Sequence, residues 1–446
     1  MKIKGEKMLM FIAAAAFASG MNAQDANSPL ATMDVTLHRA IEIALAENPT
    51  IKVAEKEIEI KKVADQEAWQ NLLPDVSVNL SLQHTLLAAE LSLNGNKFKM
   101  GKDGTNTAAG VATLNLPLFA PAVYQAMKLT KEDVKLAQEK ARSSKLDLVN
   151  QVTKAYYQVL LAQDSYNVIE QSYKISKDNF DVVNAKFGQG RVSEYDKISA
   201  EVQMRGLNSS LVSAKAGLSN AKLQLKVLMG VTANVDLNVN DKLQNYENDL
   251  KLVELESADR ELANNTALRQ LDLNERMLAR SLKMQRANFV PTLAFQLTGQ
   301  YQSLYNDTWN ILDYAWSPSA SMSFVVTIPI FKASNFTKLK TSKLQIAQLQ
   351  DTRVNTQRQL SMAVKVYKDN MASSMAQVNS NREAVVQADK AVSIASKRYE
   401  VGRGTILELN QSEVSLTQAQ LTYNQSIYEY LTNKADFEYT LGRENF

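Results

Sequence analysis

The chain of 446 residues contains no cysteine and only two histidines. Without cysteine it can form no disulfide, carry out no thiol chemistry and accept no lipid at an N-terminal cysteine. His38 and His84 are far apart in the sequence, and neither has a cysteine or paired carboxylates at the spacing of metal ligands. We therefore expect no catalytic residues, no metal site and no cofactor.

An excess of one charge is also missing. The chain has 50 basic and 47 acidic residues, a formal net charge of +3, and it contains no long run of one sign. A nucleic-acid-binding protein is expected to carry a basic patch or stripe. The composition therefore indicates no nucleic-acid partner.

Long hydrophobic runs are absent after the N-terminus. Three early lysines precede an apolar run at residues 8–18, and small and polar residues follow it. This pattern is typical of a secretory signal peptide, which we predict at residues 1–24, with cleavage near Ala23 or Gln24. The run is too short to cross a bilayer as a helix, and no later segment offers about 18 consecutive apolar residues. We expect an exported protein without a transmembrane helix.

Glycine and proline are missing from two long stretches, residues 122–187 and 332–401, of 66 and 70 residues. As single helices these stretches would each be ~100 Å long, about three times the width of a small domain. They are also copies of each other, because an apolar stripe with a seven-residue period recurs 212 positions later. The stripe comprises Val152, Val159, Tyr166, Tyr173, Phe180 and Phe187, and then Val364, Met371, Val378, Val385, Val392 and Tyr399. Such a stripe predicts a seam between packed helices.

Two amphipathic strands precede each long helix, because apolar and polar residues alternate there with a period of two. Matched prolines occur at the strand ends, where the loss of a backbone donor is tolerated. They belong to Leu73-Pro74 and Val290-Pro291 before the strands, and to Pro117-Leu118-Phe119 and Pro329-Ile330-Phe331 after them. We predict two structural repeats, residues 25–245 and 246–446, each with a helix, two strands, a long helix, a tight turn and a returning helix.

Four strands of ~10 residues have the length and alternation of membrane-barrel strands. Four strands alone would leave open edges, whose backbone groups lipid cannot satisfy. A closed barrel needs about eight strands or more, so two or three copies of the chain would have to share one barrel. A soluble β-sandwich would also show alternation, but it would not explain helices of ~100 Å.

This order of elements resembles the TolC-like outer-membrane efflux protein family over residues 35–446. The matching features are the strand-flanking prolines, the two tip turns and the opening segments Leu37-His38-Arg39-Ala40 and Asn48-Pro49. The resemblance implies a mainly α fold with a small β part. In a homotrimer, each chain would give four strands to a shared 12-stranded β-barrel, and its helical hairpins would form an α-barrel tunnel. Residues 231–262 would form a belt around the tunnel.

The resemblance also implies a function without catalysis. The chain would be the outer-membrane exit duct of a tripartite efflux or type I secretion system, passing drugs or exported proteins to the exterior. Its partners would be outer-membrane lipid, a periplasmic adaptor and, through the adaptor, an inner-membrane pump. The alternative is that the chain is itself a periplasmic adaptor, although adaptors usually carry one helical hairpin without a full duplication. A coiled-coil filament subunit would not need the four strands.

The tips of the hairpins carry the candidate site residues. Glycine supplies the positive φ that tight reversals need, and Ser193 and Thr405 are suitable N-caps for the returning helices. By resemblance, the tip turns contact the adaptor, although they could equally be simple solvated turns. These positions are Gly190, Arg191, Val192, Ser193, Gly402, Arg403, Gly404 and Thr405.

The resemblance also places a channel constriction just beyond the tip turns, at Asp196, Glu408 and Gln411. Gln411 departs from the acidic pattern that is more common in the family, so this position would supply no carboxylate. Copies of Asp196 and Glu408 around a narrow mouth would focus a negative potential and favour cations. Ordinary solvated carboxylates on a helix face are the alternative.

Overall fold

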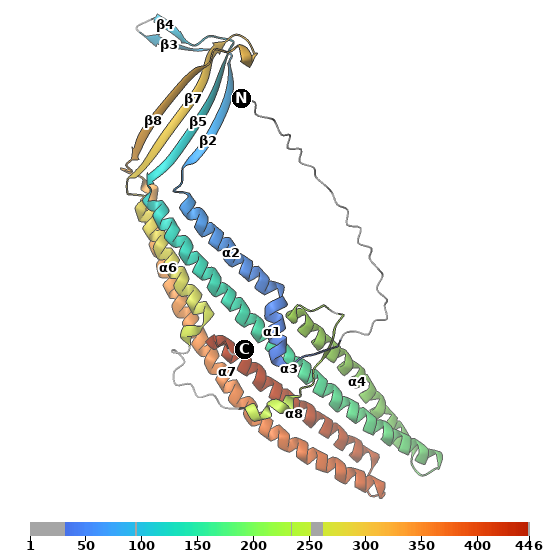
Figure 1. Cartoon of the computed structure of the whole chain (residues 1–446). Coiled ribbons are helices and arrows are strands. Elements are labelled where there is room, and N and C mark those ends of the chain that lie inside the picture. Colours follow the sequence, from blue (N-terminus) through green and yellow to red (C-terminus); the bar gives the residue numbers. More distant parts are fainter. Residues whose placement is uncertain (1–31, 94–95, 233, 251–261, 445–446) are drawn as a thin grey trace, which may run out of the picture.

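A computed structural model describes residues 32–93, 96–232, 234–250 and 262–444. The molecule is elongated, with a four-stranded sheet at one end and long helical hairpins extending from it (Figure 1). The expected signal peptide and residues 251–261 of the expected belt lie outside the described residues. Among the helices that are described, none combines the length and the apolar character needed to cross a bilayer.

The helices occur as pairs of equal length. Both long stretches are continuous helices of 68 residues, and both returning helices have 36 residues. Two helices of 22 residues pack alongside the sheet-proximal halves of the long helices (Figure 1). The pairs are α3 (Pro121–Gly188) with α7 (Ala333–Glu400), α4 (Glu194–Met229) with α8 (Ile406–Leu441), and α2 (Pro49–Gln70) with α6 (Thr266–Ala287). The exact repeat boundary stays a prediction, and residue 245 falls inside a short 3₁₀ helix.

The sheet contains the four predicted strands in the antiparallel order β2-β5-β7-β8. Strands β2 and β8 are its edges, and neither has a partner on its outer side among the described residues. The last strand ends at Thr327, two residues before Pro329, whose nitrogen cannot donate to the ladder. The strands are β2 (Asp75–Thr85), β5 (Thr105–Phe119), β7 (Thr292–Asn306) and β8 (Ser317–Thr327).

The register places the apolar residues of the alternating pattern on one face of the sheet. One row across the four strands consists of Val76, Leu114, Leu297 and Met322. The adjacent row, on the opposite face, consists of Ser77, Thr113, Thr298 and Ser321. Val76 and Met322 are largely exposed, at 65% and 74%. A single chain therefore leaves a broad apolar face uncovered.

A second hairpin lies between β2 and β5, where the sequence pattern predicts no further strands. Strands β3 (Ala89–Leu93) and β4 (Asn96–Met100) form a separate two-stranded ribbon. Lys102 fixes the base of the ribbon by an ion pair with Asp307 at 2.8 Å. Leu91 lies opposite Phe98 in this ribbon. The many glycine, lysine and asparagine residues of the segment make its alternation of apolar and polar residues hard to recognise in the sequence.

Short elements cross the middle of the helices and form the described part of the belt. Tyr156 of α3 donates a hydrogen bond to Asp241 at 2.7 Å, and Tyr423 of α8 donates one to Glu247 at 2.6 Å. Both hairpins are thereby tied to one segment. The belt and its neighbours include β1 (Thr32–Asp34), α1 (Leu37–Glu47), β6 (Asp236–Asn238), η1 (Leu243–Asp249) and η2 (Leu262–Asn264), while η3 (Ile311–Asp313) lies in the β7–β8 connection.

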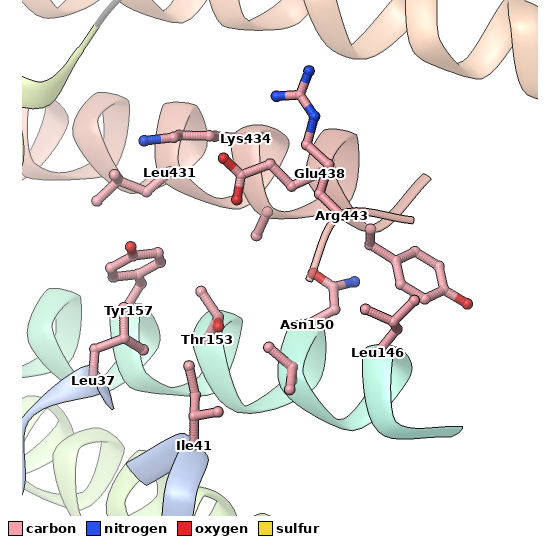
Figure 2. A pocket seen from close by; sticks show the side chains of 13 residues that line it. Leu37, Ile41, Leu146, Asn150, Thr153, Tyr157, Leu431, Lys434, Glu438 and Arg443 are labelled. Atoms are coloured by element: carbon pink, nitrogen blue, oxygen red, sulfur yellow. The ribbon is translucent and has the colours of Figure 1, made fainter. Parts of the chain in front are cut away.

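A small cavity lies between α1, α3 and α8 at the level of the belt (Figure 2). Its volume is about 130 Å³, and apolar side chains such as Ile41 and Leu431 line it together with Lys434 and Glu438. Ligand pockets usually have volumes of about 300–1,000 Å³. We read this cavity as a packing gap rather than a binding site.

The base of each hairpin is held by an asparagine. Asn48 caps α2 by accepting a hydrogen bond from the backbone of Thr50, and it donates one to the carbonyl of Leu228 at 2.7 Å. Asn265 caps α6 in the same way and donates to the carbonyl of Thr440, also at 2.7 Å. The duplication therefore extends to individual buried hydrogen bonds.

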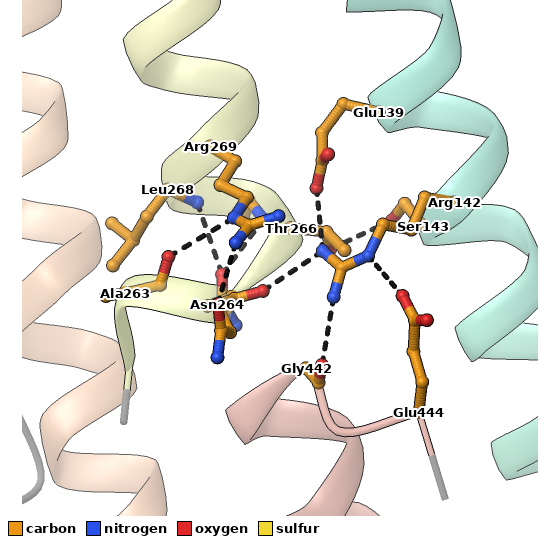
Figure 3. Close-up of polar contacts among 12 residues, drawn as sticks. Glu139, Arg142, Ser143, Ala263, Asn264, Thr266, Leu268, Arg269, Gly442 and Glu444 are labelled. Atoms are coloured by element: carbon orange, nitrogen blue, oxygen red, sulfur yellow. Dashed lines mark hydrogen bonds and ion pairs between the residues drawn. The ribbon is translucent and has the colours of Figure 1, made fainter. Parts of the chain in front are cut away.

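Arg142 adds a contact at the second of these bases (Figure 3). Its guanidinium donates to Glu444 at 2.6 Å, to Glu139 at 2.9 Å and to the carbonyl of Gly442 at 2.9 Å. Gly442 ends α8 at a φ of +67°, and an added Cβ would lie 2.3 Å from the carbonyl oxygen of Asn264. Only glycine fits this close approach.

Candidate functional site at the helical tips

Both tip turns have the same backbone geometry. Gly190 and Gly402 lie in the left-handed region, with φ of +69° and +71°. The backbone N–H of Arg191 reaches back to the carbonyl of Lys186 at 2.9 Å, and that of Arg403 to the carbonyl of Arg398 at 2.8 Å. These contacts form Schellman motifs, which satisfy the last carbonyls of α3 and α7.

The returning helices begin with side-chain caps. Ser193 accepts from the backbone of Asp196 at 3.1 Å, and the Asp196 carboxylate accepts from the backbone of Ser193 at 3.2 Å, which completes a capping box. Thr405 accepts from the backbone of Glu408 at 3.2 Å. The Glu408 carboxylate lies 3.5 Å from the guanidinium of Arg398. Both predicted carboxylates thus occupy the third position of a helix, where the helix dipole favours negative charge.

The two tips pack against each other. A small apolar cluster joins Val183 and Ala200 of the first hairpin to Ile406 and Leu409 of the second. At its edge, the Lys186 ammonium lies 5.1 Å from the centre of the Tyr399 ring. This cation–π contact crosses from one hairpin to the other and was not evident in the sequence.

Tyr399 lies beside the first tip, and its hydroxyl is buried without a hydrogen-bond partner among the described groups. Burial raises the pKa of Tyr399, and the negative charge of Asp196 adds to the shift. Asp196 therefore acts electrostatically across the contact between hairpins as well as within its own capping box.

A groove between the turns brings together most of the predicted tip residues. From the first turn it is lined by Gly190, Arg191, Val192, Ser193 and Asp196, and from the second by Gly402, Gly404 and Thr405. Arg403, Glu408 and Gln411 do not line it, and all three are exposed. Within the described ranges, no ion pair engages Arg191 or Arg403. No group of three or more histidine, aspartate or glutamate side chains in these ranges could hold a metal ion.

Comparisons with known proteins agree with this architecture, in which paired helical hairpins extend from an amphipathic sheet. Residues 40–231 and 258–443 match the family described as outer membrane efflux protein. The chain belongs to this family. It is therefore an outer-membrane channel protein and not an enzyme, and its helical part extends into the periplasm.

Individual relatives are distant but similar in length. Outer membrane protein TolC of Salmonella enteritidis is 21% identical over 411 residues, which cover 89% of this chain and 80% of the relative. The cobalt-zinc-cadmium resistance protein CzcC of Cupriavidus metallidurans is 20% identical and covers 87% of the chain and 85% of the relative. The crystal structure of VceC from Vibrio cholerae has a TM-score of 0.72 at 14% identity, over 91% of this chain and 96% of that one.

These findings confirm the predicted fold class, family and outer-membrane channel function. They also remove the alternatives of a periplasmic adaptor, a filament subunit and an enzyme, because the family match covers both halves of the chain. The roles of the tip residues stay predictions.

Proposed function

We propose that three copies of this chain close one 12-stranded barrel and one helical tunnel, through which cargo passes from the periplasm to the exterior. The observation that carries the proposal is the sheet. It has two unpaired edges, β2 and β8, in the part of the chain that the structure describes, and one continuous apolar face. Lipid tolerates such strands only in a closed barrel, so the edges of neighbouring copies must pair.

The helices support the same assembly. Val53, Ile60 and Val63 of α2 are largely exposed, at 68%, 59% and 62%. On α7, Leu344 and Met362 are 61% and 66% exposed. Apolar residues on helices at both margins of the molecule would be buried when neighbouring copies pack side by side.

We further propose that the tips bind a periplasmic adaptor, which connects the duct to an inner-membrane pump. The exposed guanidinium groups of Arg191 and Arg403 provide equivalent contacts at the two turns. The cargo is a small molecule such as a drug, or an exported protein, and the pump selects it.

Engineered cysteines test the assembly directly, because the chain has none of its own. One cysteine would replace Ser81 in β2, and a second would be scanned over Ser317, Ser319, Ser321 and Ser323 in β8. We expect at least one pair to give covalent trimers in outer membranes under oxidation. Monomers at every position, with the protein correctly inserted, would contradict a shared barrel.

We also propose that Asp196, Glu408 and Gln411 narrow the periplasmic mouth. The negative charge of Glu408 would favour cations there, and Glu408→Ala should therefore lower the cation preference of single channels in planar bilayers. Unchanged selectivity and conductance would remove Glu408 from the constriction.

A further inference from the structure

A buried carboxylic acid lies between the two hairpins, about two helical turns from the tip turns. Glu413 is on α8, one heptad after Ile406 and four residues after Leu409, both of which are core residues of the tip cluster. It occupies the same face of the helix and is only 8% exposed. A glutamate therefore stands where the helical seam would ordinarily place an apolar residue.

Among the described residues, the Glu413 carboxyl has one polar partner. The Asn179 side chain of α3 donates a hydrogen bond to its Oε1 at 2.6 Å. Its Oε2 is buried and has no partner among the described groups. One turn further along α8, Thr417 shares a hydrogen bond of 2.8 Å with Ser172 of α3. This short polar seam joins the first hairpin to the second.

The surroundings of Glu413 disfavour its charged form. Burial raises the pKa of Glu413 to about 6, and the hydrogen bond from Asn179 opposes this shift. No charged side chain of α3, α4 or α7 contributes to the shift. The charged residues on the neighbouring turns of these helices include Lys177, Asp178, Asp181, Asp389 and Lys390, which are exposed, and Glu201, which Arg205 engages.

We propose that Glu413 is a proton-dependent contact between the hairpins, which pack tightly at the tips when it is protonated and loosen when it is ionised. The protonated acid can still accept from Asn179, and it gains a donor of its own. The ionised acid leaves one charged oxygen buried without a partner, which is costly. In the duct that we propose above, and only if that proposal holds, acid would favour a closed periplasmic mouth.

The direction of the pH dependence follows from the raised pKa of Glu413. The packed arrangement binds the proton more tightly than a solvated glutamate does, so its relative stability is greatest below the ordinary value near 4.5. That stability is lost as the pH rises through about 6. The displacement corresponds to a change of up to about thirtyfold in the opening equilibrium.

Hydrogen exchange of the assembled protein tests this contact without relying on transport. Amides of α8 around residues 409–420 would be compared between wild type and Glu413→Gln at pH 5 and pH 7.5. Comparing the two proteins at the same pH cancels the chemical exchange rate. We expect wild type to exchange up to about thirtyfold faster at pH 7.5 but only about fourfold faster at pH 5, where the packed Glu413 is mostly protonated. Equal exchange at pH 7.5 would overturn the inference.

Two further variants keep the test decisive. Asp389→Asn removes an exposed carboxylate from the neighbouring helix α7 and should behave like wild type at both pH values. Asn179→Ala removes the group that lowers the pKa of Glu413, so the pH transition should move upward. If Glu413→Gln does not assemble, an unmoved transition in Asn179→Ala overturns the inference by itself.

Channel recordings separate this inference from the proposed function. In planar bilayers, wild type should open more at pH 7.5 than at pH 5, and Glu413→Gln should remain at least as closed at both pH values as wild type is at pH 5. A protein that forms no pore at any pH would defeat the proposed duct, while the exchange experiment would still decide the role of Glu413. Pores with the same pH response in both proteins would overturn the inference alone.

Discussion

Single asparagine side chains connect segments that are far apart in the sequence. Asn48 and Asn265 each cap a helix and also hydrogen-bond the last turn of a returning helix, 180 and 175 residues away. Each side chain therefore satisfies backbone groups of two helix ends at once. These contacts fix where the returning helices end beside the start of α2 and α6.

Replacing Asn265 tests the strength of this arrangement. Asn265→Ala should lower the free energy of unfolding by about 2 kcal/mol, because it removes a helix cap and a buried hydrogen bond. Urea unfolding of the detergent-solubilised protein measures the change. The control is Asn264→Ala, since the Asn264 side chain only accepts from Arg269 at an exposed position. A loss as large in the control as in Asn265→Ala would argue against the double role.

Part of the candidate site at the helical tips could be predicted from the sequence. Ser193 and Thr405 were recognisable as caps, and Gly190 and Gly402 as turn residues. The burial of Glu413 was missed, because a glutamate among serine and glutamine resembles a solvated helix face. Its spacing of seven from Ile406 was the available signal. The contacts of Asn265 with Thr440 and of Lys186 with Tyr399 depend on how the hairpins pack, which local sequence does not specify.

At the level of elements, some strands could be predicted from the sequence and others could not. Alternation and flanking prolines predicted all four strands of the sheet, and their pairing order follows the chain. The β3–β4 ribbon was missed, because its strands have only five residues each and lie in a polar, glycine-containing segment. Short strands carry too few alternations to be distinguished from loops.

Adjacent residues of β5 provide a matched test of the two sheet faces. Leu114→Lys places a charge on the apolar face and should reduce trimer yield in outer membranes, because lysine costs about 2–4 kcal/mol at the bilayer midplane. Thr113→Lys changes the opposite, polar face and should assemble normally while shifting channel selectivity toward anions. Heat-modifiable trimers on gels and reversal potentials measure these outcomes. The opposite pattern would mean that the faces have been assigned the wrong way round.

At the scale of the whole molecule, the tips lie at the end of the molecule farthest from the sheet (Figure 1). Arg191 and Arg403 repeat the same turn position in both hairpins and are exposed. In the proposed assembly, a ring of such turns would present six guanidinium groups toward the adaptor. The partner surface would then carry acidic or carbonyl groups.

The double variant Arg191→Glu with Arg403→Glu should lower co-purification of the adaptor at least tenfold, because it reverses the charge of every tip. Trimer formation and insertion should be unaffected, since neither side chain makes an ion pair in the described structure. Arg276→Glu, an exposed change on α6, serves as the control. Undiminished adaptor binding by the double variant would place the contact elsewhere.

The equal lengths of the paired helices restrict how this protein can change in size. One residue added to α3 alone would rotate the part of the hairpin after the insertion by about 100° about the helix axis. It would also shift the first tip turn along that axis relative to the second. Insertions or deletions would have to come in sevens and in all four tip helices together, each step altering the reach into the periplasm by ~10 Å. Relatives that span envelopes of different depth should therefore differ in length by multiples of about 28 residues per chain, which is one heptad in each of the four helices.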